Sequence, residues 1–323
     1  MEKKVKIGEP FVNCYSKFAA LTSILAIDDR AVKWGILHYS IPMYMRSKQN
    51  EVFWMDLRSD ENTVWEPEWK LCPFIDGDQI ETAQIIDNGT FSGFLINCID
   101  KNYCIYTDIC VASIKAYHTK SERQHDLFIF GYDLEEHIFI CRDYFSLKYE
   151  ERRIPFEELE DAFKRKAGCE TRKDYNFIYK FRDADRKYTP TLEEYRLYIK
   201  KMLYPVNFYS YEPGTEKRFE FYFGTEAYRH LFQDYKNGVL EWNDLRPLYV
   251  IRNHLQLLKS LSDCFALSNE DALHSLIKQH EIICHLAIKL GITKNEGIKE
   301  KIIALSDDFI SKEEQYLEKI LTD

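Results

Sequence analysis

The sequence predicts an α+β protein whose C-terminal part is mainly helical. Short apolar runs of the strand type gather between residues 91 and 181, whereas apolar stripes with a helical period dominate after residue 190. Hydrophobic residues make up 45% of the 323 residues and charged residues 30%, which is typical of a globular chain with a sizeable core. The length permits two modest domains, which we expect to be residues 1–185 and a helical accessory or lid region, residues 186–323.

The first half is expected to begin with a helix and to continue as strands. Residues 14–26 fit a helix because Phe18, Leu21 and Leu25 recur at helical spacing. Residues 28–90 are rich in aromatic side chains and lack a clear period, so irregular structure is expected there. The remaining segments are expected to be strands at 91–99, 102–109, 126–132, 137–143 and 175–181, with a strand end and a short helix over 154–163.

The second half carries helix caps in front of apolar stripes. Thr191 and Glu194 form a capping-box pattern at the start of a stripe that reaches Met202. Ser268 begins a second such pattern, and Gly291 is a typical helix end. The expected helices cover about 192–202, 224–235, 248–258, 268–291 and 308–321.

The charge balance and hydropathy argue against two classes of partner. The chain carries 44 basic and 53 acidic residues, a net charge of −9, whereas a protein that follows a phosphate backbone needs excess Lys and Arg. We therefore expect no nucleic-acid partner. No apolar stretch approaches the ~18 residues of a membrane helix, and no secretory signal follows Met1, so we expect a cytoplasmic protein without membrane contact.

Cysteine usage and short motifs exclude further classes. An odd number of cysteines, nine, in a chain of this length argues against a disulfide framework and favours buried free thiols in a reducing compartment. The chain contains no Cys-x-x-Cys, no His-x-x-x-His and no glycine-rich phosphate-binding motif. We therefore expect neither a metal site nor a bound nucleotide cofactor.

Cys14 is the most informative single residue. It lies at or just inside the start of the first expected helix, where unpaired N–H groups and the helix dipole favour an anion. A thiolate is such an anion, so this position favours a reactive thiol. The alternative interpretation is a small buried side chain that only packs against the helix.

A histidine and an aspartate are brought together by one predicted hairpin. His125 opens an apolar strand, and Asp143 ends the strand that returns beside it. The start of one antiparallel strand lies next to the end of its partner, so these two side chains are expected to be neighbours. Together with Cys14 they form a candidate nucleophile, base and orienting group. The alternatives are a surface histidine at a strand end and an aspartate that caps a turn.

Other residues are weaker candidates for the same roles. His118 lies in a polar segment outside the strand, and His137 lies at the far end of the hairpin from His125. Asp126 adjoins His125 and is expected to point to the opposite face, whereas Asp133 lies in the turn. These positions fit a His–Asp pair less well than His125 and Asp143.

The segments around these residues resemble the family of butirosin biosynthesis protein H, which are cysteine acyltransferases with a papain-like N-terminal domain. The resemblance rests on a cysteine after asparagine at a helix start, a histidine strand ending in Gly-Tyr-Asp with a following strand ending in Asp, and two later segments. In this chain these are Asn13-Cys14, His125–Asp133 with Asp143, Ile154–Ala162 and Tyr222–Tyr228.

The resemblance implies an activity and the residues that carry it. Such enzymes move an acyl group from the thioester of an acyl or peptidyl carrier protein onto a small amine, and relatives form amides in thiotemplated pathways such as closthioamide assembly. Cys14 would be the nucleophile, His125 the base and Asp143 the orienting residue, with the Cys14 N–H and Asn13 as oxyanion donors. Phosphopantetheine would enter only as part of the carrier-protein substrate, and no other cofactor is implied.

Two other functions stay open at this point. The same three residues would serve a cysteine peptidase or amidase, and the same scaffold would serve a non-catalytic binding protein. Two basic clusters, Arg152-Arg153 and Lys164–Lys166, would be a solvated face in most proteins but could dock an acidic carrier protein.

Overall fold

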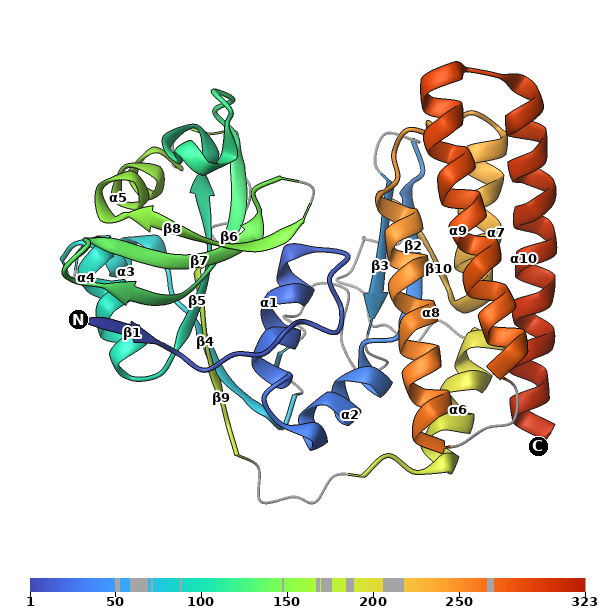
Figure 1. Cartoon of the computed structure of the whole chain (residues 1–323), viewed down its shortest axis with the longest axis horizontal. Helices are drawn as coiled ribbons and strands as arrows, with labels where there is room; N and C mark the ends of the chain where they lie inside the picture. The colour runs from blue at the N-terminus through green and yellow to red at the C-terminus, as the bar shows by residue number, and fades with distance from the viewer. Residues whose placement is uncertain are drawn as a thin grey trace. The chain divides into compact units, whose positions relative to one another are not determined.

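The chain folds as two compact units of the α+β class (Figure 1). One unit comprises Met1–Val32 with Cys72–Lys187, and the other comprises Lys33–Leu71 with Tyr188–Asp323. The expected units are residues 1–185 and 186–323, whereas in this division residues 33–71 belong to the second unit and the later boundary follows residue 187. The computed structural model describes residues 1–49, 53–58, 69–70, 72–87, 89–146, 148–166, 169, 176–183, 189–205, 218–265 and 270–322.

The first unit is built on an antiparallel seven-stranded sheet in the order β4-β9-β5-β6-β7-β8, with β1 added to β6. A bulge between Ile129 and Gly131 separates the part of β6 that pairs with β5 from the part that pairs with β1. A Cβ atom at Gly131 would lie 2.9 Å from the Lys3 carbonyl oxygen, so glycine lets β1 approach. The strands are β1 (Glu2–Lys4), β4 (Ile75–Gln79), β5 (Cys104–Cys110), β6 (Gln124–Asp133), β7 (Ile138–Tyr144), β8 (Tyr149–Pro155) and β9 (Asn176–Phe181).

Helices enclose the core of this unit. Phe91 of α4 stacks on Phe163 of α5, with ring centroids 3.7 Å apart, within a buried cluster that includes side chains of β5, β6 and β7. Helix α1 contacts β6, β7 and β9. The helices are α1 (Ser16–Leu25), α3 (Thr82–Asp87), α4 (Phe91–Asp100) and α5 (Phe156–Arg165), with short 3₁₀ turns η1 (Val111–Ser113) and η2 (Lys115–Tyr117). Helix α2 (Asp29–His38) contains the division between the two units, which falls after Val32.

The expected strand at residues 91–99 is wrong, because this segment is helix α4. Thr90 caps the helix by accepting a hydrogen bond from the Gly93 N–H at 3.1 Å. The buried positions Phe91, Leu95 and Cys98 recur at helical spacing. A short apolar run fits a strand as well as a buried helix, and here the cap and this spacing identify the helix.

The second unit contains a three-stranded antiparallel sheet that sequence patterns did not reveal. Its order is β10-β2-β3, with strands β2 (Ile41–Ser47), β3 (Phe53–Arg58) and β10 (Phe219–Phe223). Strand β2 is almost entirely buried and so has no alternation of polar and apolar residues. The irregular structure expected over 28–90 is therefore replaced by α2, β2, β3, β4 and α3 in the described part of that segment.

The helices of the second unit largely follow the expected stripes. The predicted capping box at Thr191 and Glu194 is confirmed. Helix α9 continues past Gly291, the last helix begins at Glu296, and Ser268 lies outside the described residues. Helix α10 contacts α6, α7 and α9, and Figure 1 shows α9 and α10 side by side. The helices are α6 (Leu192–Leu203), α7 (Gly224–Lys236), α8 (Arg246–Phe265), α9 (Glu270–Thr293) and α10 (Glu296–Thr322).

The backbone at the start of α7 requires a glycine at position 224. Its φ is +58°, which L side chains rarely adopt, and a Cβ atom there would lie 2.2 Å from the Met202 carbonyl oxygen. The chain can therefore turn from β10 into α7 against the end of α6 only with glycine at this position.

All nine cysteines are free thiols. Six of them are buried, Cys14 and Cys284 are half-buried, and Cys264 is exposed. Burial raises the pKa of the Cys98 thiol to about 11, so such core thiols are unreactive near neutral pH. Among the helices of the described ranges, none has the length and apolar character needed to cross a bilayer.

Candidate active site

Cys14 lies just before helix α1 rather than inside it. The first helical residue is Ser16, and Tyr15 occupies the N-cap position in an extended conformation. The expected start of this helix at residue 14 is therefore wrong by two residues. The positive end of the α1 dipole is at this N-terminus, and Cys14 precedes the first helical residue by two positions. Its side chain is half-buried and therefore partly open to solvent.

Asp143 is a fully buried carboxylate with two hydrogen-bond donors and one ion-pairing histidine. Its Oδ1 atom accepts a hydrogen bond from the Ser16 hydroxyl at 2.6 Å. Its Oδ2 atom accepts one from the Tyr117 hydroxyl and lies 2.9 Å from Nε2 of His125. A buried carboxylate needs such donors, because each unpaired lone pair would carry a desolvation cost.

His125 meets Asp143 as the hairpin predicted. The register of β6 and β7 pairs Phe128 with Arg142, and one step further along the hairpin Asp143 lies beside Leu127. His125 is on the same face as Leu127, two residues away, which is the diagonal distance that long side chains span. The predicted proximity of His125 and Asp143 is therefore observed, with the imidazole side chain 26% exposed.

The surroundings of His125 favour its protonated form. Burial by itself would lower the pKa of the imidazole, but the hydrogen bond and the negative charge of Asp143 outweigh burial and raise the pKa above its ordinary value. Within the described part of the chain, Asp143 is the only hydrogen-bonding or ion-pairing partner of this ring, and it engages Nε2. Nδ1 is thus the nitrogen through which His125 can exchange a proton with a reacting group. The rings of Tyr117 and His125 form a T-shaped pair, with centroids 5.8 Å apart and an interplanar angle of 81°.

The segment that carries Cys14 is fastened to the end of β7 at two points. The Tyr144 hydroxyl donates a hydrogen bond to the Asn13 carbonyl, and the Ser16 hydroxyl bonds to Asp143. Cys14 lies between these two anchored residues. Neighbouring Cα atoms are about 3.8 Å apart, so Cys14 is at most two such steps from a side chain bound to the Asp143 carboxylate. The fold thereby brings the Cys14 backbone and the His125–Asp143 pair to one end of the same sheet.

The rival candidates form other interactions. His118 and His137 are exposed residues with positive φ, and no carboxylate in the described residues pairs with either. Asp126 accepts a hydrogen bond from the Tyr106 hydroxyl at 2.7 Å. Asp133 caps the β6–β7 turn through the Glu135 N–H at 2.9 Å. Asp126 adjoins His125, and its charge also favours the protonated imidazole, but the carboxylate that contacts the ring is that of Asp143.

Two residues of this cluster were not identified from the sequence. Ser16 follows Cys14 by two positions, and its role requires the approach of α1 to β7. Tyr117 lies in η2, within the irregular link between β5 and β6, where no periodic pattern marks a residue. An aromatic hydroxyl in such a link becomes informative only when the strand register is known.

The two basic clusters are largely neutralised within their own unit. Arg153 pairs with Glu2 and Glu136, and Arg165 pairs with Glu122 and Asp161. Lys166 is buried, and its ammonium donates a hydrogen bond to the Asn176 side chain at 2.9 Å. These arginines thus form ion pairs within the first unit. No group of three or more potential metal ligands occurs among the residues that the structure describes.

Comparison with known proteins does not assign this chain to a family, so the family resemblance rests on its motifs alone. No protein-family model matches the sequence, and a search of curated proteins returns no significant match.

Proposed function

We propose that the chain is a cysteine-dependent acyltransferase that forms an amide. Cys14 is the nucleophile, His125 the base and Asp143 the residue that orients the base, on a papain-like first unit. The observation that carries this proposal is the His125 Nε2–Asp143 Oδ2 contact of 2.9 Å at the end of the sheet where the Cys14 segment is anchored. A thiol, an imidazole and an orienting carboxylate are the groups that nucleophilic acyl transfer requires.

Activation of the thiol follows from the charges around His125. The imidazole takes the thiol proton of Cys14 at Nδ1, while Nε2 stays bound to Asp143. The imidazolium that results is stabilised by the Asp143 charge, which is the same interaction that raises the pKa of His125. The thiolate is the nucleophilic form of cysteine, so the pair increases the reactive fraction near neutral pH.

The acyl group then passes through the enzyme in two steps. The Cys14 thiolate attacks the thioester carbonyl, the carrier thiol leaves with a proton from His125, and an acyl-Cys14 thioester remains. An amine attacks this thioester, His125 takes the proton that the nitrogen loses, and the Cys14 thiolate leaves as the amide forms. One thioester replaces another in the first step, and the amide is more stable than either, so no ATP is required. The Cys14 N–H and the Asn13 side chain are the proposed oxyanion donors.

The proposal names a carrier-protein thioester as donor because the motifs resemble acyltransferases that use one. The phosphopantetheine arm belongs to that substrate and not to this chain. The His–Asp pair by itself would also activate water, and the resulting enzyme would be a hydrolase. An experiment must therefore establish whether an amine or water accepts the acyl group.

The test uses a small acyl thioester, such as an N-acetylcysteamine thioester, with intact-mass detection. We expect one acyl adduct on Cys14, released faster by an added primary amine than by water. The Cys14→Ala variant should form no adduct, whereas Cys264→Ala, which removes an exposed thiol of the other unit, should behave as wild type. Release to the free acid at a rate independent of amine would identify a hydrolase. A chain that forms no adduct would contradict the enzymatic proposal and favour a binding protein.

A further inference from the structure

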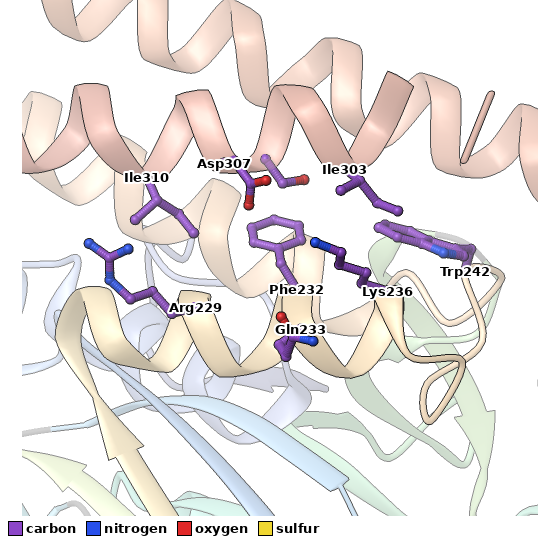
Figure 2. A pocket seen from close by; sticks show the side chains of 9 residues that line it. Arg229, Phe232, Gln233, Lys236, Trp242, Ile303, Asp307 and Ile310 are labelled. Carbon is purple, nitrogen blue, oxygen red and sulfur yellow. The ribbon is translucent and has the colours of Figure 1, made fainter. Parts of the chain in front are cut away.

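A cavity of about 290 Å³ lies in the second unit between α7 and α10. Each helix contributes one stripe, with residues 229, 232, 233 and 236 on α7 and residues 303, 306, 307 and 310 on α10. The segment after α7 contributes Trp242 (Figure 2). This volume is near the lower end of the ~300–1,000 Å³ range of small-molecule sites, which suits one small molecule rather than a large cofactor.

The cavity has an apolar floor. Phe232, Trp242 and Ile310 line it and are only 5%, 8% and 3% exposed. The indole ring of Trp242 stacks on Tyr235, with centroids 4.4 Å apart, which holds the indole in place. A floor of this kind accepts an aliphatic or aromatic side chain of a ligand.

One cation and one carboxylate border this floor from opposite helices. Figure 2 shows Lys236 of α7 and Asp307 of α10 reaching toward the Phe232 ring from opposite sides of the cavity. Within the described residues, neither side chain forms a salt bridge. Arg229 differs, because Glu314 binds its guanidinium at 2.5 and 2.6 Å and Glu226 lies 3.2 Å from it. Lys236 and Asp307 are therefore the charges of this cavity that a ligand can engage.

We propose that this cavity binds a free amino acid with an apolar side chain. The ligand carboxylate would pair with Lys236, its ammonium with Asp307, and its side chain would cover Phe232 and Ile310. A singly charged ligand would leave one of the two facing charges unpaired, whereas a zwitterion satisfies both. This inference does not depend on the chemistry proposed for Cys14, which lies in the other unit.

Isothermal titration with leucine and two analogues tests the proposal on the unmodified protein. Isoamylamine lacks the carboxylate of leucine, and 4-methylpentanoate lacks its ammonium. We expect leucine to bind at millimolar concentration or below and each analogue to bind at least about five-fold more weakly, because each loses one ion pair. Glycine, which lacks the apolar side chain, should bind more weakly than leucine. Equal affinity for leucine and both analogues, or no heat of binding with leucine at millimolar concentration, would overturn the proposal.

Variants that each remove one charge of the cavity locate the binding site. Lys236→Met and Asp307→Asn alter exposed side chains, so both variants should fold normally, and each should weaken leucine binding about five-fold. Lys289→Met removes an exposed lysine of α9 and should leave affinity unchanged. The Cys14→Ala variant should also bind leucine as wild type does. Unchanged affinity in both Lys236→Met and Asp307→Asn would place the ligand elsewhere and refute this site.

Discussion

Each unit of the chain contains a histidine next to a buried carboxylate, and the two pairs differ in every other respect. In the first unit His125 lies 2.9 Å from Asp143, and the imidazole is 26% exposed. In the second unit His254 lies 3.3 Å from Glu313, and both side chains are fully buried. The first pair can therefore meet a substrate, whereas the second is sealed in a helical core.

The two carboxylates also differ in their hydrogen bonds. Asp143 accepts from Ser16 and Tyr117 in addition to its contact with His125. Neither oxygen of Glu313 has a hydrogen bond with good geometry to any described residue, although His254 is within ion-pairing distance. Burial raises the pKa of Glu313, and the nearby His254 only partly opposes this. A His–carboxylate pair therefore indicates a candidate active site only when solvent and a nucleophile can reach it.

The largest expected effect concerns Cys14, the proposed nucleophile of the first unit. Cys14→Ala should reduce acyl-adduct formation below detection, because no other group supplies the nucleophile. Thermal unfolding should change little, since the side chain is half-buried. Mass spectrometry of the acylated protein measures the effect. Full adduct formation by the variant would remove Cys14 from the mechanism.

Loss of Glu313 should instead act on stability. Glu313→Ala leaves His254 buried without its partner, and breaking a buried pair commonly costs about 3–5 kcal/mol. Chemical denaturation should show this loss of unfolding free energy, while the acylation rate per folded molecule stays at the wild-type value. A variant as stable as wild type would show that the buried pair contributes nothing to the fold.

The matched histidine variants should separate the two roles. His125→Ala should lower acylation by about 10²-fold or more, the usual contribution of a general base, and Asp143→Asn should lower it less. His254→Ala should lower unfolding free energy without a comparable loss of acylation per folded molecule. Equal acylation rates in both histidine variants would break the proposed distinction between the pairs.

Tyr117→Phe should have a smaller effect on both activity and stability. The substitution removes one of the hydrogen-bond donors to the buried Asp143 carboxylate. Loss of such a donor commonly lowers the unfolding free energy by about 1–3 kcal/mol. We expect the acylation rate to drop only several-fold. The pH midpoint of Cys14 alkylation should not fall. Ser16→Ala offers a second donor deletion on the other carboxylate oxygen, and wild-type stability in both variants would contradict the solvation role.

The smallest effect is a pH dependence of stability. The pKa of His125 is raised in the folded state, so its interaction with Asp143 stabilises the fold below the unfolded histidine value of about 6.5 and is lost as pH rises through the folded value. The difference in unfolding free energy between wild type and His125→Asn should therefore be larger at acidic pH than at alkaline pH. A difference that grows with rising pH would reverse the sign and contradict the assignment.

Local features of the chain were predictable, and long-range ones were not. The β6–β7 hairpin joins segments adjacent in sequence, so the His125–Asp143 contact followed from strand order alone. The Thr191 cap followed in the same way. The sheet of the second unit pairs residues 43–47 with residues 219–223, which no local pattern indicates. Ser16 and Tyr117 reach Asp143 only after α1 and η2 have packed at the end of β7.

The pH dependence of Cys14 alkylation by iodoacetamide, followed by mass spectrometry, tests the central claim most directly. If His125 and Asp143 activate the thiol, the midpoint of the alkylation rate should lie below the ordinary thiol pKa of about 8.5, and Asp143→Asn and His125→Ala should each move it upward. A wild-type midpoint at or above that value, unchanged in both variants, would show that the pair does not act on Cys14 and would contradict the proposed mechanism.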